Sequence, residues 1–310
     1  HQLFAVMNNS HEIRVMNLDP SLEHSGDIDL PGASPRYMAI HRESHRGFVS
    51  CWSLSGIVVI DLNTLDVIDT LSLGKLPEQI LIEGDDLFVS VPMLNDWSAD
   101  NTVIQIDLSG NDFTILNTFE VISGPGAMVK SGDLLYVTSI YYNDAWETYS
   151  GTSAINLLDR SVITTDHGYY PNFTADIDLI NGAPYRTFGN SVVPLNQDMS
   201  LDTASGLGDI SSIYTFSVLN DRVVIGSSDF IAPDEVHVLS LAGETLGSFL
   251  VGALPSDFAY YDGDVVSIAA HGQLPQSFSL GDAYPNPFNP TTSIPIHLNL
   301  NAYVTLKIYD

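Results

Sequence analysis

The chain has 310 residues and carries 38 acidic residues against 10 basic ones, a formal net charge of −28. This balance excludes nucleic acid and anionic membrane surfaces as expected partners, because binding either one requires a basic patch. Hydrophobic residues make up 45% of the chain without any run of 18 apolar residues, so we expect a sizeable core and no transmembrane segment.

A pattern of alternating apolar residues, closed by a polar residue and a turn, recurs about every 44 residues. Strand-like runs precede and follow each copy, and Gly, Asp and Asn stand at the breaks, which is typical of antiparallel strands joined by tight turns. Four strands per repeat at this spacing predict an all-β fold built of β-propeller blades. The polar residues that close the copies, called anchors below, are Asn17, Asp61, Asp107, Asn156, Asn196 and Ser240.

The regular recurrence of the anchors argues against a catalytic or metal-binding role for them. An Asp or Asn at the end of a strand can accept a hydrogen bond from the backbone two residues further on and so fix a turn. We therefore predict a structural role, once per blade, and assign no catalytic residue.

His41 and His45 are two histidines close in sequence, in the stretch "AIHRESHRG". They are predicted to lie in a turn between strands, where a spacing of four does not place them on one helix face. A metal or anion site at a blade end is one interpretation, and a solvated turn is the other. Cys51, the only cysteine, follows in a strand and is expected to be a small buried residue.

Residues 48–82, "FVSCWSLSGIVVIDLNTLDVIDTLSLGKLPEQILI", carry the repeat most clearly. This stretch resembles the YVTN family of propeller repeats, whose units run as a "YV-N" strand, a "V-VID--T" strand and a "V--TI-VG" strand. The resemblance covers residues 4–137 and 222–262 and weakens between 140 and 212. It implies a β-propeller of four-stranded blades.

Two acidic turns offer oxygen ligands of the kind that hard cations prefer. They are "NDWSADN" (95–101) and "DLSGNDF" (107–113). Neither fits the twelve-residue calcium loop, because the closing Glu is absent. We therefore predict no cofactor and leave calcium open as an alternative to solvated turns.

The stretch "SIYYNDAWETYSG" (139–151) interrupts the repeat and is rich in aromatic residues. Clustered aromatic rings beside Asn, Asp and Glu suit stacking on sugars or contact with a protein. The alternative is that they pack over the edge of a blade. The candidate binding residues are Tyr141, Tyr142, Trp146 and Tyr149.

Six anchors imply at least six blades. Residues 264–270, "DVVSIAA", resemble the second strand of a further blade, whose other strands we expect from residues ahead of His1. We therefore favour seven blades in the intact protein, with six as the alternative. The propeller is expected to span residues 1–272, followed by a linker at 273–279.

Residues 280–310 begin with the proline-rich stretch "YPNPFNP" and continue into two strand-like runs. Prolines fix φ and remove backbone donors, so this stretch predicts a stiff elbow that ends the propeller. The segment resembles the N-terminal half of the C-terminal sorting domain of the type IX secretion system, an immunoglobulin-like β-sandwich. That resemblance implies export across an outer membrane. Its motif residues are Tyr284, Pro285, Asn286, Pro287, Phe288, Asn289 and Pro290.

Together these patterns favour a secreted or outer-membrane-surface β-propeller that acts as a binding or scaffold module. Its expected partners are the secretion machinery and an extracellular protein or glycan. The alternative is a secreted propeller enzyme, either a lactonase-like hydrolase or a metal- or quinone-dependent oxidoreductase. No nucleophile elbow, phosphate loop or HExxH helix is present, so the sequence leans away from an enzyme without deciding the question. Polar side chains converging at the central axis would favour the enzyme, and an exposed aromatic patch would favour the binding module.

Overall fold

The computed structural model describes residues 1–18, 22–110, 112–231, 233–261, 278–280 and 296–298. Nearly all regular structure in these residues is β-strand; the one helical element among them is a single 3₁₀ turn, Thr203–Ser205. The all-β prediction is therefore confirmed for the described part of the chain.

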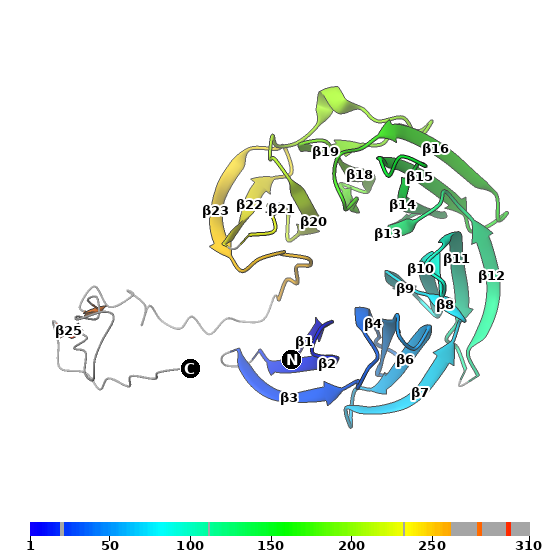
Figure 1. Cartoon of the computed structure of the whole chain (residues 1–310), viewed down its shortest axis with the longest axis horizontal. Coiled ribbons are helices and arrows are strands. Elements are labelled where there is room, and N and C mark those ends of the chain that lie inside the picture. The colour runs from blue at the N-terminus through cyan, green and yellow to red at the C-terminus, as the bar shows by residue number, and fades with distance from the viewer. Residues whose placement is uncertain (19–21, 111, 232, 262–277, 281–295, 299–310) are drawn as a thin grey trace. The chain divides into compact units, whose positions relative to one another are not determined.

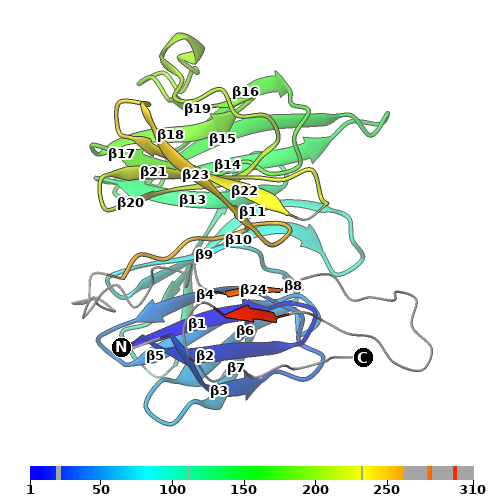
Figure 2. The same ribbon diagram turned by 90° about the vertical axis from the view of Figure 1, so that its left-hand side faces the viewer.

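Six antiparallel sheets follow one another along residues 1–260 and are arranged around a central axis (Figure 1). Figure 2 shows this unit from the side, with strands running from one end of the blades to the other.

Blade 1 contains β1 (Gln2–Met7), β2 (Glu12–Asn17) and β3 (Glu23–Asp29); blade 2 contains β4 (Pro35–His41), β5 (Arg46–Cys51), β6 (Gly56–Asp61) and β7 (Asp66–Ser72). Blade 3 contains β8 (Lys75–Leu76), β9 (Ile80–Glu83), β10 (Asp86–Leu94), β11 (Ala99–Asp107) and β12 (Thr114–Glu120); blade 4 contains β13 (Pro125–Ser131), β14 (Leu134–Tyr142), β15 (Thr148–Asn156) and β16 (Val162–Tyr169). Blade 5 contains β17 (Ile177–Ile180), β18 (Ala183–Phe188) and β19 (Ser191–Pro194); blade 6 contains β20 (Ile213–Leu219), β21 (Arg222–Ser227), β22 (Asp234–Ser240) and β23 (Thr245–Val251).

The fold is thus an all-β, six-bladed β-propeller, which is the alternative blade number and not the favoured seven. The seventh blade was inferred from residues 264–270, which lie outside the described residues. The preceding segment, 252–260, is described but contains no strand.

The blades differ in how completely they match the four-stranded pattern. Blades 2, 4 and 6 have four strands, and in blade 3 the innermost position is divided between β8 and β9, which both pair with β10. Blade 1 has three strands, of which β2 ends at the anchor Asn17 as β6 ends at Asp61. Within the described residues, the innermost position of blade 1 is therefore the one without a strand.

Blade 5 departs most from the repeat, in the region where the sequence pattern weakens. Its outer edge is formed by isolated bridges from Val192 to Leu207 and from Leu195 to Leu201. The degenerate copy expected at 191–197 does contain a strand, β19.

Four of the six anchors, Asp61, Asp107, Asn156 and Ser240, accept a hydrogen bond from the backbone N–H two residues on, as predicted. The carboxylate of Asp61 accepts a hydrogen bond from the backbone N–H of Asn63 at 2.8 Å, and Asp107 accepts one from Ser109 at 2.8 Å. The side-chain oxygen of Asn156 accepts one from Leu158 at 2.9 Å. These bonds lower the pKa of the Asp61 and Asp107 carboxyl groups, because they stabilise the charged form.

The cores lie between neighbouring blades. Between blades 2 and 3, Phe48, Ile57, Leu87 and other apolar side chains form one cluster, and similar clusters lie between blades 1 and 2, 3 and 4, and 5 and 6. The cluster between blades 4 and 5 has three buried members, Ala127, Ile177 and Leu195. Cys51 is fully buried as expected, and burial raises the pKa of its thiol to about 12.

The second compact unit takes in residues 261–310 with 19–21. Its described part is one antiparallel pair, β24 (Phe278–Leu280) with β25 (Ile296–Leu298), in which Phe278 faces Leu298. The sorting-motif residues 284–290 and the second predicted strand at 303–310 lie outside the described residues. No helix in the described part of the chain has the length and apolar character needed to cross a membrane.

Candidate functional site

Exposed aromatic side chains gather at the blade ends where the second and third strands of a blade are joined. These turns lie between β5 and β6, β10 and β11, β14 and β15, and β21 and β22. Because successive blades repeat the same strand order around the axis, these turns lie on one face of the propeller. Connections from the outer strand of one blade to the next blade lie on the same face. The aromatic face, as it is called below, consists of the half-buried Trp52 and the exposed Trp97, Tyr142, Trp146 and Phe230 at these hairpins, with the exposed Phe173 between β16 and β17.

The four aromatic residues predicted from the insertion all lie on the β14–β15 hairpin, which the insertion lengthens, but they form two pairs. Tyr141 is the cross-strand partner of Tyr149, and their rings stack with centroids 5.8 Å apart. Tyr149 also meets Tyr169 of β16 edge to face at 6.3 Å. Burial, with the Asp166 carboxylate nearby, raises the pKa of the Tyr141 hydroxyl to about 12. This pair therefore matches the alternative interpretation, packing on a blade.

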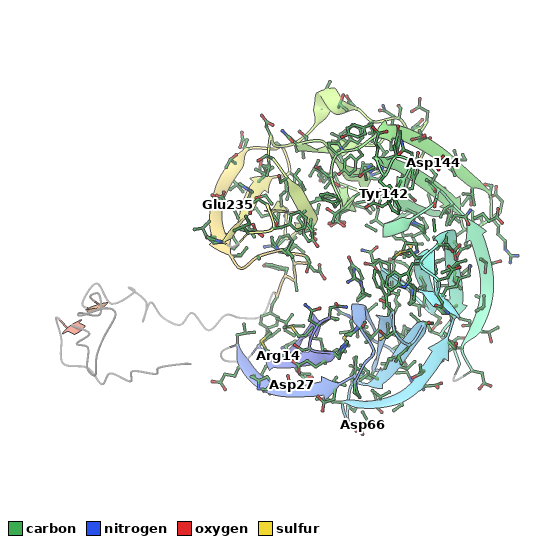
Figure 3. All side chains as sticks on the ribbon, viewed as in Figure 1. Arg14, Asp27, Asp66, Tyr142, Asp144 and Glu235 are labelled. Atoms are coloured by element: carbon green, nitrogen blue, oxygen red, sulfur yellow. The ribbon has the colours of Figure 1, made fainter. Side chains whose placement is uncertain are left out.

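Tyr142 and Trp146 form the second pair, at the tip of the same hairpin, where Figure 3 labels Tyr142 and Asp144. Their ring centroids are 6.1 Å apart, and the side chains are 50% and 82% exposed. Trp146 has a φ of 61°, a left-handed conformation that is uncommon for a bulky residue. Tyr142 and Trp146 are therefore the part of the insertion that is exposed to solvent.

Trp97 and Trp52 form a second aromatic pair, between blades 2 and 3, in which Trp97 is exposed and Trp52 is half-buried. Their rings meet edge to face at 5.6 Å, and Trp97, 65% exposed, also has a left-handed φ of 68°. The guanidinium of Arg36 lies 4.4 Å from the centre of a Trp52 ring and forms two hydrogen bonds with Glu78, at 2.6 and 3.0 Å. The indole N–H of Trp52 is the single buried side-chain nitrogen or oxygen without a hydrogen-bond partner among the described residues.

A third aromatic group joins blades 5 and 6. Phe230 meets Phe173 at 5.9 Å and Tyr214 at 6.0 Å, in both cases edge to face. Phe230 is 53% exposed and has a φ of 68°, and the neighbouring Ile231 is 72% exposed. The aromatic face therefore extends over blades 2 to 6.

Sequence reasoning found the blade 4 aromatic residues and missed the others, although a signal was present. Trp97, Trp146 and Phe230 each stand ten residues before an anchor, and Trp52 stands nine before one. Aligning the repeats on their anchors would have placed all four in the same hairpin turn.

Polar side chains in or next to the inner strands of blades 2, 3 and 5, and in the segment after blade 6, also lie close enough to influence one another electrostatically. The pKa of Tyr37 is raised, first by burial and then by the carboxylates of Glu78, Asp176 and Asp257. Burial raises the pKa of Asp176 to about 6 and also raises that of Asp257. One oxygen of Asp176 accepts a hydrogen bond from the backbone N–H of Phe216 at 3.0 Å, so this carboxyl group also joins blade 5 to blade 6.

Of the two histidines predicted as metal ligands, His41 but not His45 belongs to the cluster of metal-ligating side chains found in the described residues. His41 ends β4 and is 5% exposed, whereas His45 lies in the following turn with a φ of 53°. The side chains near His41 are instead Glu43 and Asp85.

In the two turns considered for calcium, Asp96 and Asp107 accept hydrogen bonds from within their own turns, whereas Asp100 pairs with Lys75 at 2.6 Å. Asp96 accepts hydrogen bonds from the backbone N–H and the hydroxyl of Ser98, at 3.0 and 2.5 Å. Asp107 accepts one from Ser109, as described above. Neither turn is among the clusters of metal-ligating side chains found in the described residues, and calcium there stays an untested alternative.

Comparison with known proteins supports the fold. No protein-family model matches the chain, and no curated protein matches it. Among solved structures, a chain of Kuenenia stuttgartiensis hydrazine synthase has a TM-score of 0.61 at 13% identity, covering 77% of this chain and 73% of that one. A chain of a nidogen/laminin complex has a TM-score of 0.55 at 14% identity, covering 80% and 92%. The Myceliophthora thermophila Cps50 (Swd1) β-propeller domain has a TM-score of 0.53 at 9% identity, covering 77% and 80%. At such identities these likenesses establish that the chain is a β-propeller and carry no function with them.

Proposed function

We propose that this β-propeller is a binding or scaffold module that contacts an extracellular protein or glycan through its aromatic face. The observation that carries the proposal is the set of bulky aromatic side chains at Trp97, Trp146 and Phe230, each exposed by more than half and held at a left-handed φ. Exposed aromatic groups cost solubility, and a left-handed conformation costs a bulky residue about 1 kcal/mol or more. Aromatic rings are also the side chains that most often anchor protein interfaces and stack on sugars.

The strong negative charge of the chain limits the classes of ligand that the aromatic face can bind. A formal charge of −28 repels acidic polysaccharides and acidic proteins, so we propose a neutral glycan or a neutral to basic protein surface. The nidogen/laminin structure is a protein complex, and its likeness to this chain supports a scaffold role only at the level of the fold.

The test uses a triple variant, Trp97→Ala, Trp146→Ala and Phe230→Ala, assayed by affinity electrophoresis against soluble neutral polysaccharides and by pull-down with extracellular protein. We expect each lost ring to weaken binding by about tenfold, or about 1 to 1.5 kcal/mol. The matched control is Leu158→Ala with Ile163→Ala, two residues 76% and 62% exposed that lie outside the aromatic face. Equal loss in both variants, or no loss in the triple variant, would contradict the proposal.

The same proposal includes secretion to the cell surface by a type IX-like system. It is supported by the ordered sequence match at residues 280–310 and by the β24–β25 pair, in which Leu280 faces Ile296. The test replaces residues 284–290 with Gly and Ser in the intact precursor, in a bacterium that has this system. Loss of surface delivery is expected, and unchanged delivery would contradict the proposed route.

A second candidate function, a propeller enzyme, is favoured by the polar side chains that influence one another electrostatically around Tyr37. A carboxyl group with a pKa of about 6, such as Asp176, is suited to act as a general base near neutral pH. The Asp176→Asn variant distinguishes the two functions, since a hydrolase would lose turnover of lactone or ester substrates while glycan binding at the aromatic face would be kept.

A further inference from the structure

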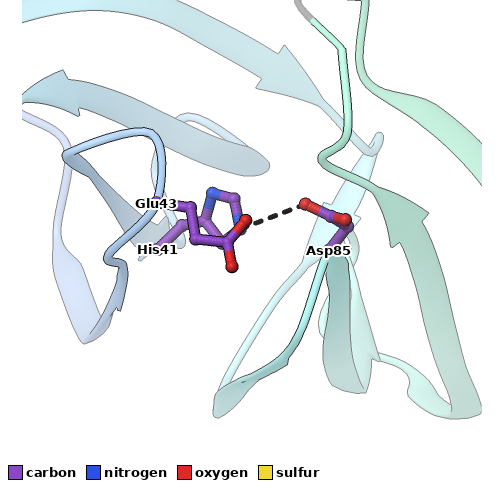
Figure 4. Close-up of side chains that lie close together, drawn as sticks. All are labelled: His41, Glu43 and Asp85. Carbon is purple, nitrogen blue, oxygen red and sulfur yellow. Dashed lines mark ion pairs between the residues drawn. The ribbon is translucent and has the colours of Figure 1, made fainter.

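We propose that His41, Glu43 and Asp85 bind a divalent cation of the zinc class, at the end of the blades opposite to the aromatic face. Figure 4 shows the three side chains approaching one another from two blades. His41 is the last residue of β4, and Glu43 lies in the turn that follows. Asp85 lies in the turn between β9 and β10, after Gly84, whose φ of 59° shapes that turn.

The separations among the ligand atoms fit a tetrahedral centre. One nitrogen or carboxylate oxygen from each side chain lies within 4.8 Å of the others, and His41 Nε2 is 3.3 Å from an Asp85 oxygen. Zinc binds nitrogen and oxygen at about 2.0 to 2.2 Å, so two ligands of a tetrahedral centre stand about 3.4 Å apart. The His41–Asp85 pair already has this spacing. Glu43, on an exposed turn, needs to move by only about 1 Å.

The hydrogen bond of the second imidazole nitrogen also fits a metal ligand. His41 Nδ1 lies 2.8 Å from the hydroxyl of Ser44. A neutral imidazole donates from one nitrogen only, so in the tautomer that donates to Ser44 the Nε2 lone pair faces the Asp85 carboxylate. A cation bound between Nε2 and this carboxylate would take the place of their direct contact. Histidine ligands usually have such a hydrogen-bond partner on the other nitrogen.

The surroundings leave room for the cation and for a further ligand. A cavity of ≈340 Å³ is lined by these residues and by Ser44, Arg46, Leu108, Ser109 and Gly110. Arg46 is the basic side chain in this lining, and its guanidinium also lies 3.5 Å from the Gly110 carbonyl and 5.9 Å from the centre of the Phe113 ring. Two carboxylates and a neutral imidazole, offset by this one cation, keep the site net negative. With three protein ligands, a fourth position stays open to water or an anion.

An imidazole with two carboxylates selects against calcium and magnesium, which take all-oxygen ligand sets. It also differs from the sequence-based pair, because His45 is not a member. A bound cation would join blade 2 to blade 3 at this end and should therefore stabilise both.

The experiment is titration of chelator-stripped protein with zinc chloride at 150 mM NaCl, followed by calorimetry and by metal analysis after dialysis. We expect one zinc per chain and a rise of about 5 °C in Tm at a hundredfold excess over the dissociation constant. Asp85→Asn and Glu43→Gln alter exposed side chains and should leave the fold intact, while weakening zinc binding by tenfold or more. His41→Gln should abolish binding, with its folding checked by circular dichroism without metal.

Three controls separate this site from the general attraction of an acidic chain for cations. His45→Gln removes the neighbouring histidine, and His237→Gln removes a histidine that faces a single carboxylate, Glu235, at 3.8 Å. Both should bind zinc as the parent chain does, and calcium at equal concentration should not compete. Unchanged binding in Asp85→Asn, or lost binding in His45→Gln, would overturn the proposal.

Discussion

Two interfaces of the propeller are stabilised by different chemistry. One lies between blades 2 and 3, and the other lies between blades 4 and 5. The first is a continuous apolar cluster in which Phe48, Leu87 and Val89 are almost completely buried. The second has few apolar side chains and is centred on Arg186, the largest fully buried side chain in the described residues. A propeller blade therefore needs a well-packed neighbour, but that neighbour need not be apolar.

Arg186 connects β18 of blade 5 to β15 of blade 4 through hydrogen bonds to neutral oxygens. Its Nη1 donates to the carbonyl of Gly151 at 2.8 Å and to the hydroxyl of Thr152 at 2.7 Å. Its other donors bond the Ser150 hydroxyl and the Thr187 carbonyl. Burial lowers the pKa of Arg186 to about 10, so the side chain stays charged at neutral pH. Neutral oxygens thus take the place of a counter-ion, and each would lose this donor without the guanidinium.

The largest effect is expected for Arg186→Ala, which breaks the polar interface. Several buried acceptors lose their donor and a cavity opens, so we expect a loss of about 4 kcal/mol in the free energy of unfolding. Urea unfolding followed by fluorescence measures it. Arg222→Ala is the control, because Arg222 is exposed and donates to the adjacent Asp221 carbonyl at 3.2 Å. A loss below about 1 kcal/mol for Arg186→Ala would mean that the network contributes little.

A slightly smaller effect is expected for Leu87→Ala, which breaks the apolar interface. Leu87 is 0% exposed, and truncation of a buried leucine costs about 3 kcal/mol through lost burial and a residual cavity. Leu158→Ala, at a residue 76% exposed, should change the free energy of unfolding by less than about 0.5 kcal/mol. If Leu87→Ala and Leu158→Ala have the same free energy of unfolding, the apolar cluster does not stabilise the contact between blades 2 and 3.

The same contrast explains what the sequence could predict. Alternation of apolar residues indicates strands packed on both faces, so residues 48–82 predicted β5, β6, β7 and β9 well. Between 140 and 212 the interface is polar, so hydropathy no longer marks the buried face. Nothing in the pattern indicates that Arg186 is buried, because an isolated arginine is usually exposed.

Turns were predictable because their chemistry is local, whereas the candidate sites were not. An anchor such as Asp61 bonds its own backbone two residues on. Asp85 instead meets His41 from a separate blade, and this pairing depends on the angle between blades. The sequence accordingly singled out His41 but gave no sign that Asp85 lies beside it.

A smaller effect, which depends on pH, is expected on the free energy of unfolding when Asp176 is changed. This residue joins blade 5 to blade 6. Its pKa is about 6 in the folded protein against a usual 3.8, so the folded state binds this proton more tightly than the unfolded state does. The resulting stabilisation is present below about pH 3.8 and is lost as the pH rises through 6.

Asp176→Asn should therefore gain about 2 kcal/mol in the free energy of unfolding relative to the parent chain between pH 4 and pH 7.5. Asparagine keeps an oxygen for the Phe216 N–H, so the contact between blades should persist. Urea unfolding of both proteins at each pH measures the difference, and the lowered pKa of His167, about 4 because of burial, is common to both and cancels. A difference that is constant with pH would show that Asp176 is ionised in the folded state at all these values.

The smallest effect on the free energy of unfolding is expected for changes of Trp146, which is exposed at the tip of the β14–β15 hairpin of blade 4. Glycine takes up a φ of 61° without strain, and the exposed indole contributes little packing beyond Tyr142. Trp146→Gly should therefore raise the free energy of unfolding by about 0.5 kcal/mol, whereas Trp146→Ala, which keeps the strain, should leave it unchanged or slightly lower. Thermal unfolding of the two variants side by side resolves this order. If Trp146→Gly is more stable than the parent chain, Trp146 lowers stability, as expected of a side chain kept for binding. If Trp146→Gly clearly lowers the free energy of unfolding, the ring instead stabilises the fold.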